Sequence, residues 1–268
     1  MSIENQPRSV SQTEQWEKCG WRFYLQRVER VPERPAAWSF HGTAFHSAAE
    51  ERERSGRAKG EEELVQLFSD QYSALVNKAL AKEPNLDWWM TAMKKPAGED
   101  IADRYRLGQQ QVRDYVKWSE ENKPIISYVS DNKDGRKLGL EVGFNVELGG
   151  VKVRGYIDQL VHEEDPETQD ERVRDLKTGS TKSLFQLQTY KIASEKQWGI
   201  RVNKGDWYMG KTGKLSRVVN LSQVTEAQVA ARYVAMDQGV KAGRFEPNPG
   251  FDCGFCSVSH ACQFSRAR

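Results

Sequence analysis

The segment 138–148 constrains the fold of this chain more than any other. Apolar residues alternate strictly with Gly, Glu and Asn along it, which is typical of a strand with one buried face. Gly149-Gly150 then fits a two-residue hairpin turn, and the alternation resumes over 151–157. We therefore expect an antiparallel hairpin that forms part of a larger sheet.

The polar face of this hairpin carries two acidic residues. If Leu148 pairs with Val151, Glu141 lies directly opposite Asp158. Cross-strand neighbours have Cβ atoms about 4.5–5.5 Å apart, and like charges placed there repel. A divalent cation would remove the repulsion, and hard oxygen ligands suit Mg²⁺ or Mn²⁺. A solvated polar face is the alternative, because strand registers slip and bulge.

A second pair of charged residues follows on the strand predicted at 172–177. Asp175 and Lys177 project to the same face, because residues i and i+2 of a strand do so. Alone, such a pair usually marks an exposed ion pair. One strand after the acidic hairpin, it indicates a candidate site for metal-assisted phosphodiester hydrolysis.

Polar residues on two predicted helices complete this set. A helix expected after Gly42 carries His46, which adds a nitrogen donor, although a single helical His is more often a packing or surface residue. Gln186 and Tyr190 share one face of a helix predicted at 183–197. The alternative interpretation is that these two residues form the polar edge of an ordinary amphipathic helix.

The rest of the chain is predicted to be mostly helical before the hairpin and to alternate between strands and helices after it. Apolar spacing predicts further helices and strands, at 12–30, 61–82, 99–121, 207–209, 215–221 and 224–241. No apolar run approaches the roughly 20 residues that span a bilayer, and no secretory signal opens the chain, so we expect a cytoplasmic protein. The net charge of +2 identifies no partner.

The cysteines indicate a second metal site. Their spacing sets Cys19 far from a cluster formed by Cys253, Cys256 and Cys262. A cytosolic chain has little use for disulfides, so these residues favour a four-thiolate metal site that joins the two chain ends. A structural zinc ion that also uses His260 is the rival interpretation.

The ordered set of motifs resembles the RecB-like branch of the PD-(D/E)XK nuclease superfamily. The motifs are Gly42-x3-His46, Gly155-Tyr-Ile-Asp158, Asp175-Leu-Lys177-Thr-Gly and Gln186-x3-Tyr190. With its cysteines, the chain is similar to the iron–sulfur nucleases of the AddB and Cas-four types. The resemblance spans 9–262. The chain departs from the family in a helical stretch at 56–124, which could arch over a DNA strand or merely pack against the rest of the protein.

This resemblance implies a role for each motif residue. His46, Asp158, Asp175 and the backbone carbonyl of Leu176 would bind Mg²⁺ or Mn²⁺, and Lys177 would be the catalytic lysine. Glu141, Gln186 and Tyr190 would support the reaction from the preceding strand and the following helix. Cys19, Cys253, Cys256 and Cys262 would hold a [4Fe-4S] cluster.

The resemblance also implies an α/β fold with a restriction-endonuclease-like mixed sheet flanked by helices, a helical insertion and an iron–sulfur clasp joining the N- and C-terminal regions. We expect four parts: N-terminal helices at 1–54, a helical insertion at 55–124, the nuclease core at 125–245 and the cysteine cluster at 246–268. The segment 205–212 fits GxxxxGK[ST], but its bulky middle, Trp207-Tyr208-Met209, argues against a phosphate-binding loop.

The function that these observations predict is a metal-dependent DNA exonuclease acting on single strands or ends in recombination, repair or replication. A helicase or a recombinase would be its partner. Side chains predicted to contact DNA are Trp88, Trp89, Lys94, Lys95, Arg104 and Arg106, although the tryptophans could equally be core. A non-catalytic DNA-binding or assembly module and a CRISPR-adaptation capture nuclease are the alternatives.

Overall fold

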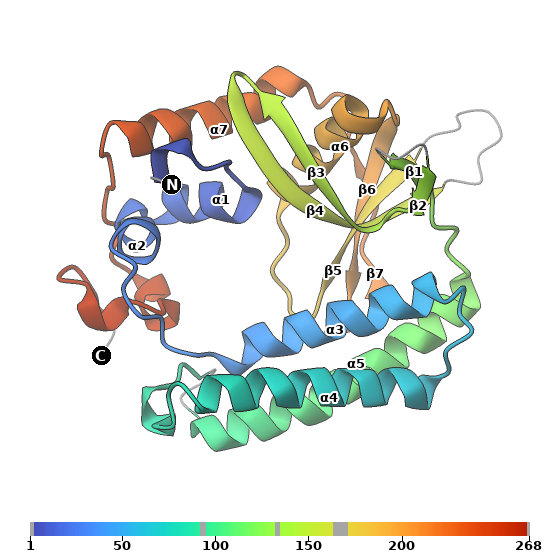
Figure 1. Cartoon of the computed structure of the whole chain (residues 1–268), viewed down its shortest axis with the longest axis horizontal. Coiled ribbons are helices and arrows are strands. Elements are labelled where there is room, and N and C mark those ends of the chain that lie inside the picture. The colour runs from blue at the N-terminus through green and yellow to red at the C-terminus, as the bar shows by residue number, and fades with distance from the viewer. Residues whose placement is uncertain (1–2, 92–94, 132–134, 163–170, 267–268) are drawn as a thin grey trace. The chain divides into compact units, whose positions relative to one another are not determined.

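The computed structural model describes residues 3–91, 95–131, 135–162 and 171–266 (Figure 1). The chain forms two compact units. The first comprises Met1–Pro35, Phe144–Gly155 and Val224–Arg268, and the second comprises Ala36–Gly143 and Tyr156–Gln223. The four-part division expected from the sequence follows different boundaries and stays a prediction.

A mixed six-stranded sheet runs through the chain in the order β3-β4-β5-β6-β7, with β8 paired to β6. Its strands are β3 (Leu140–Leu148), β4 (Val151–His162), β5 (Glu171–Lys177), β6 (Val202–Met209), β7 (Lys214–Leu215) and β8 (Val219–Asn220). β5 and β6 are parallel, whereas β4–β5, β6–β7 and β6–β8 are antiparallel. The chain is thus an α/β protein with a mixed sheet flanked by helices.

The predicted hairpin is formed by β3 and β4. Gly149 and Gly150 have φ values of 58° and 79°, so both central turn residues adopt the left-handed conformation that a two-residue hairpin turn needs. Every second residue of β3 is buried, as the alternation predicted.

The strand does not continue back to Leu138, contrary to the sequence prediction. A Cβ on Gly139 would lie 2.8 Å from Leu160 Cβ, so the backbone passes too close to β4 for a regular strand. The chain breaks at Gly139, and Gly135–Leu138 forms β2, which pairs with β1 (Tyr128–Asp131) in a separate two-stranded sheet. This small sheet was not predicted.

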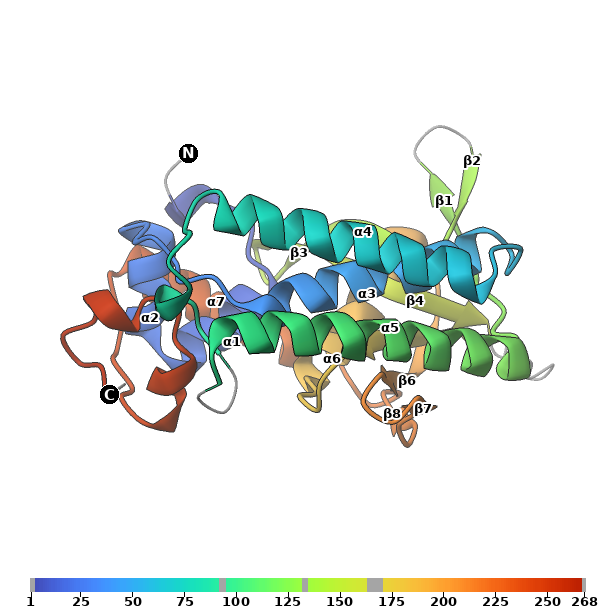
Figure 2. The same ribbon diagram turned by 90° about the horizontal axis from the view of Figure 1, so that it is seen from below.

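Three helices of the second unit lie alongside one another, α3 (Ala37–Arg54), α4 (Glu61–Leu80) and α5 (Ala97–Asn122) (Figure 2). Their buried residues form a cluster that includes Phe45, Phe68 and Tyr115 and extends to Leu176 of β5 and Tyr208 of β6. The helical insertion therefore packs against the sheet. The helices predicted at 61–82 and 99–121 are confirmed.

The helix that carries His46 begins earlier than predicted. α3 starts at Ala37, and Gly42 lies inside it. Phe40 contacts Trp89 with ring centroids 6.1 Å apart, and His41 is fully buried, so packing anchors the helix well before Gly42.

The opposite face of β5 and β6 is covered by α6 (Leu184–Trp198), which confirms the helix predicted at 183–197 (Figure 1). A Cβ on Gly205 would lie 3.0 Å from Leu187 and 3.4 Å from Val173, so α6 packs closely on the strands here. The Ser183 hydroxyl caps the helix by accepting a hydrogen bond from the Gln186 backbone N–H at 3.0 Å.

The first unit contains α1 (Val10–Lys18), α2 (Gly20–Phe23), the π-helical turn η2 (Tyr24–Val28) and α7 (Glu226–Lys241). This unit also contains three short 3-10 helices, η1 (Ile3–Asn5), η5 (Phe251–Phe255) and η6 (Ser259–Ala261). A further 3-10 helix, η3 (Leu86–Trp88), lies in the second unit. Phe23, Met236 and Val240 form the buried centre of this unit. No described helix has the length and apolar character needed to span a membrane.

The single helix predicted at 12–30 is interrupted at Cys19, which is extended with φ −161° and ψ 100°. A Cβ on Gly20 would lie 2.7 Å from the backbone nitrogen of Glu246, so the chain turns here to pass the C-terminal segment. Cys19 consequently lies at a break between helices and not on a helix face.

Burial of His41 makes the stability of the protein sensitive to acid. Its side chain is fully buried, and burial together with the Arg104 charge lowers its pKa to about 4. The unfolded chain binds this proton near pH 6.5, so stability falls as the pH drops from about 6.5 to about 4, by up to about 3 kcal/mol.

We expect a His41→Leu variant to lose this part of the acid sensitivity. Its free energy of unfolding, measured by urea denaturation between pH 7 and pH 4, should fall less steeply than that of the wild type. Parallel curves for the two proteins would contradict the assignment.

Candidate metal centre

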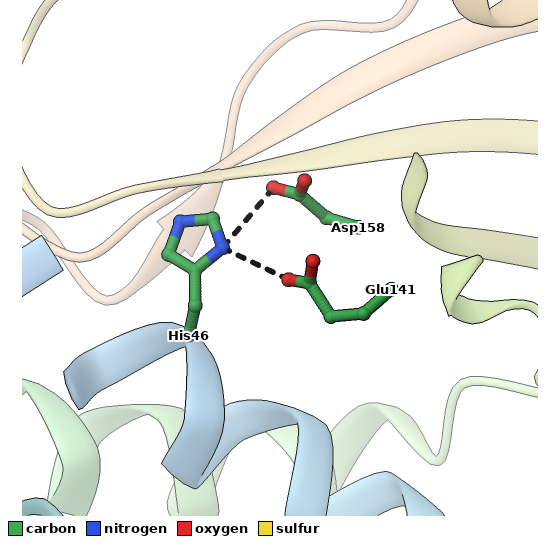
Figure 3. Close-up of side chains that lie close together, drawn as sticks. All are labelled: His46, Glu141 and Asp158. Atoms are coloured by element: carbon green, nitrogen blue, oxygen red, sulfur yellow. Dashed lines mark hydrogen bonds and ion pairs between the residues drawn. The ribbon is translucent and has the colours of Figure 1, made fainter. Parts of the chain in front are cut away.

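The imidazole of His46 projects from α3 toward the sheet and meets one carboxylate oxygen each of Glu141 and Asp158 (Figure 3). Its Nδ1 lies 3.1 Å from Glu141 Oε1 and 3.5 Å from Asp158 Oδ2. Its Nε2 lies 3.0 Å from the backbone carbonyl oxygen of Leu176. Side chains from α3, β3 and β4 thus bring a nitrogen and two carboxylate oxygens together at Nδ1, while the Leu176 carbonyl of β5 lies against the other ring nitrogen.

Glu141 reaches this point through an unusual backbone conformation. Its φ is 44°, in the left-handed region that costs a residue with a side chain roughly 1–2 kcal/mol. Nothing in the sequence pattern indicates this conformation, because the alternation of β3 continues through it. The strain places a half-buried carboxylate beside His46 and Asp158.

Asp158 and Asp175 are buried carboxylates on adjacent strands. Asp158 Oδ2 accepts a hydrogen bond from the Leu176 backbone N–H at 2.8 Å, which fixes its orientation. Burial raises the pKa of both groups, and the neighbouring Asp158 helps raise the pKa of Asp175 to about 7. Two such carboxylates are costly to hold in the charged form unless cations compensate them.

Lys177 supplies one compensating charge and links the strand to α6. Its ammonium donates hydrogen bonds to Asp175 Oδ1 and to Gln186 Oε1, each at 3.0 Å. The Gln186 amide donates to the Tyr190 hydroxyl at 2.7 Å, and that hydroxyl donates to Asp158 Oδ1 at 3.5 Å. The helix motif therefore orients both the lysine and the carboxylate.

His46 supplies the other compensating charge. Burial alone would lower its pKa, but Asp158 and Glu141 outweigh burial and raise the pKa to about 9. The ligand atoms of His46, Glu141 and Asp158 all lie within 4.8 Å of one another. Among the described His, Cys, Asp and Glu residues, no other group of three is this close. A nitrogen donor with carboxylate and carbonyl oxygens fits Mg²⁺ or Mn²⁺, so these residues could hold a divalent ion.

The structure brings together every predicted residue of this site, from His46 on α3 to Tyr190 on α6. We call the set of His46, Glu141, Asp158, Asp175 and the Leu176 carbonyl the candidate metal centre, or metal centre for short. Two features were missed by sequence reasoning, the Leu176 N–H that holds Asp158 and the left-handed Glu141.

A family model of the PD-(D/E)XK nuclease superfamily matches residues 7–263, which is nearly the whole chain and includes the entire metal centre. The chain belongs to the PD-(D/E)XK nuclease superfamily. Membership implies nucleic acid as the substrate class and is consistent with a divalent metal ion as cofactor.

Two relatives come from mycobacteriophages and are both described as Gene 69 protein. The protein of Mycobacterium phage L5 is 33% identical over 280 residues, covering 95% of each chain. That of phage D29 is 34% identical over 265 residues, covering 95% of this chain and 96% of the relative. A solved structure described as "Crystal structure of SSO0001" is similar at 16% identity and a TM-score of 0.34, covering 60% of this chain and 77% of that one.

In this PD-(D/E)XK protein, the two tryptophans predicted to stack on DNA differ in their exposure to solvent. Trp89 is only 3% exposed and belongs to the apolar cluster under α3, so its predicted contact with DNA is wrong, because its ring is not accessible. Trp88 is 36% exposed.

The basic residues predicted to contact DNA form ion pairs within the protein. Lys95 and Arg106 each lie 2.6 Å from an Asp103 carboxylate oxygen, and Arg104 lies 3.4 Å from Asp100. Lys94 lies outside the described residues. These pairs give the basic residues a role inside the protein, and contact with DNA stays a prediction for them.

The segment 205–212, which fits a phosphate-loop pattern, lies in the sheet. Gly205 to Met209 belongs to β6, and residues 210–213 make the turn to β7. Thr212 is followed by a strand, so the helix N-terminus that would bind phosphate does not follow this segment.

The four cysteines of this nuclease-superfamily protein all lie in the first unit, and each is a free thiol. All four line one pocket, which Trp21 and Arg22 also border. Within the described part of the chain, no three of their sulfur atoms lie within 4.8 Å of one another, so they are not clustered as the ligands of a single ion would be. Burial and the neighbouring thiols raise the pKa of Cys256 and Cys262.

Proposed function

We propose that this protein is a metal-dependent DNA exonuclease that hydrolyses phosphodiester bonds of single-stranded DNA or DNA ends. The observation that carries the proposal is the convergence of His46, Glu141 and Asp158 near the Asp175–Lys177 ion pair. Carboxylates that bind a cation and a lysine held next to them are the parts that phosphodiester hydrolysis needs. The exonuclease mode rests on the sequence resemblance.

Each residue of the metal centre would have its own role in phosphodiester hydrolysis. His46, Asp158, Asp175 and the Leu176 carbonyl would hold the cation, and Glu141 would support it from β3. The cation supplies Lewis-acid polarisation of the phosphate and a more acidic water molecule. Lys177, held by Gln186, places its positive charge where negative charge develops on the phosphate. Tyr190 keeps Asp158 and Gln186 in place.

A non-catalytic DNA-binding module is the competing function. Such a module would have no need of the strained Glu141 or of two buried carboxylates with raised pKa, and both features cost folding free energy. Retention of this costly arrangement favours catalysis.

The test is digestion of labelled DNA with Mg²⁺ or Mn²⁺. Linear single-stranded and double-stranded substrates, each labelled at one end, are compared with covalently closed circular single-stranded DNA. We expect linear single strands to be degraded and circles to survive. Cleavage of circles at the same rate would refute the exonuclease mode, and failure to degrade any substrate would refute the proposal.

We also propose that Cys19, Cys253, Cys256 and Cys262 bind a [4Fe-4S] cluster. The support is that four free thiols line one pocket while their sulfur atoms stay apart. A tetrahedral zinc site, with Zn–S bonds of about 2.3 Å, needs sulfur atoms about 4 Å from one another. In a cubane cluster each thiolate binds a different iron atom, so the sulfur atoms are spaced more widely.

Anaerobically purified protein should accordingly be brown and contain about four iron atoms per chain. Cys256→Ser should lose the visible absorption and the iron, because a cluster ligand is removed, whereas His260→Ala should keep both. Colourless protein that contains zinc would establish the rival site, especially if His260→Ala releases the metal.

The cellular setting follows from the same proposal. DNA as substrate and four free cysteines fit a cytoplasmic protein that acts in recombination, repair or replication. A helicase or a recombinase that exposes single strands would be a suitable partner.

A further inference from the structure

An open cleft of about 460 Å³ reaches the metal centre at His46 and Glu141. His46 and Glu141 lie on its wall together with Glu50 of α3 and Tyr156 of β4. The carboxylates make this wall acidic, which disfavours the phosphate backbone everywhere except at a bound cation. Among the described residues on this wall, Tyr156 is the one that offers a neutral, flat aromatic ring.

Tyr156 is unusually exposed for an aromatic residue in a central part of the sheet. Its exposed fraction is 65%, whereas Ile157 and Asp158, which follow it, are buried. Because residues i and i+2 of a strand face the same side, Tyr156 projects on the side of Asp158, a residue of the metal centre. No described residue forms a hydrogen bond with the Tyr156 hydroxyl.

Gly143 on the neighbouring strand β3 supports the ring. A Cβ at this glycine would lie 3.2 Å from Tyr156 Cε1 and 3.6 Å from Cδ1, so the ring rests directly against the β3 backbone. The Gly143 carbonyl in turn accepts a hydrogen bond from Gln197 of α6 at 3.2 Å. One side of the ring is thus backed by the protein while much of its surface stays open.

We propose that Tyr156 stacks on a nucleobase next to the scissile phosphate and thereby selects single-stranded DNA. This inference rests on the proposed nuclease function and names the substrate class for that site. Bases inside a duplex are paired and stacked on their neighbours, so only an unpaired strand or a frayed end presents a free base. Stacking tolerates any base, since every base has an aromatic face.

The test compares two oligomers of equal length, with Ca²⁺ in place of Mg²⁺ to prevent cleavage. One is oligothymidylate, and the other carries abasic units on the same sugar–phosphate backbone. Tyr156→Ala should weaken oligothymidylate binding about 10-fold, within a range of about 5- to 100-fold, and leave abasic binding unchanged. Tyr156→Phe should bind like the wild type, because the ring remains.

Tyr128 provides a matched control. It is 60% exposed but lies on β1 in the small separate sheet, so Tyr128→Ala should bind both oligomers like the wild type. Unchanged oligothymidylate binding by Tyr156→Ala, or equal weakening with both oligomers, would overturn the stacking role.

Cleavage of the same oligomers with Mn²⁺ separates this inference from the proposed function. If the wild type cleaves DNA and Tyr156→Ala behaves identically on both oligomers, stacking fails and the nuclease stands. If the wild type cleaves neither oligomer but shows the base-dependent loss of binding in Tyr156→Ala, the nuclease proposal fails and stacking stands.

Discussion

A Lys177→Met variant is expected to degrade DNA about 10²- to 10³-fold more slowly than the wild type while keeping its fold. Methionine preserves much of the length and apolar character of the lysine stem but removes the ammonium. That ammonium lies 2.8 Å from Asp175 and 3.0 Å from Gln186, so it is held in place before any substrate arrives. Removing one such preorganised charge from a developing anion typically costs about 10²–10³ in rate.

The measurement is the single-turnover rate on end-labelled single-stranded DNA at saturating Mn²⁺. It should be made above pH 7, because loss of the ammonium raises the pKa of Asp175 beyond about 7 and weakens metal binding at neutral pH. Lys191→Met is the matched control, since Lys191 is a buried lysine paired with Glu195 on α6, outside the metal centre. Wild-type rates in Lys177→Met would exclude its catalytic role.

The parts of the site that the sequence predicts are those set by local geometry. The alternation of β3 and the Gly149-Gly150 turn place Glu141 and Asp158 on neighbouring strands, and the two-residue period of β5 places Asp175 beside Lys177. These relations need only the periodicity of a strand and a two-residue turn. They could be predicted before any tertiary packing was known.

The parts that could not be predicted depend on how elements approach one another. His46 reaches the Leu176 carbonyl because α3 packs on β5, a contact with no signature in its own sequence neighbourhood. The break at Gly139 arises from the proximity of Leu160, 21 residues further along the chain. Trp88 and Trp89 are adjacent in sequence, yet packing against Phe40 buries only the second.

The second large effect concerns Asp158, whose loss should abolish metal binding without harming the fold. Asp158→Asn keeps an oxygen for the Leu176 N–H but removes the buried negative charge that would bind the cation. We expect at least about a 10³-fold loss of nuclease activity, because this centre would position the metal, the substrate and the attacking water together.

The metal-free variant should be at least as stable as the metal-free wild type. Burial raises the pKa of Asp158 above its ordinary value, so the folded state holds the charged form less favourably than the unfolded state at neutral pH. Removing that charge therefore relieves a cost of folding, and the lost contact with the His46 imidazolium at 3.5 Å offsets only part of the gain.

Thermal unfolding with and without Mn²⁺ separates the two effects. A ligand at 100 times its dissociation constant stabilises a protein by about 2.7 kcal/mol, so the wild type should unfold at a higher temperature with Mn²⁺ while Asp158→Asn should not. Asp114→Asn removes a half-buried carboxylate of α5 outside the centre and should retain the full metal effect. If Asp158→Asn kept that effect, the cation would have to bind elsewhere. If the Asp158→Asn variant is stable but inactive, the Asp158 carboxylate serves catalysis at the expense of folding free energy.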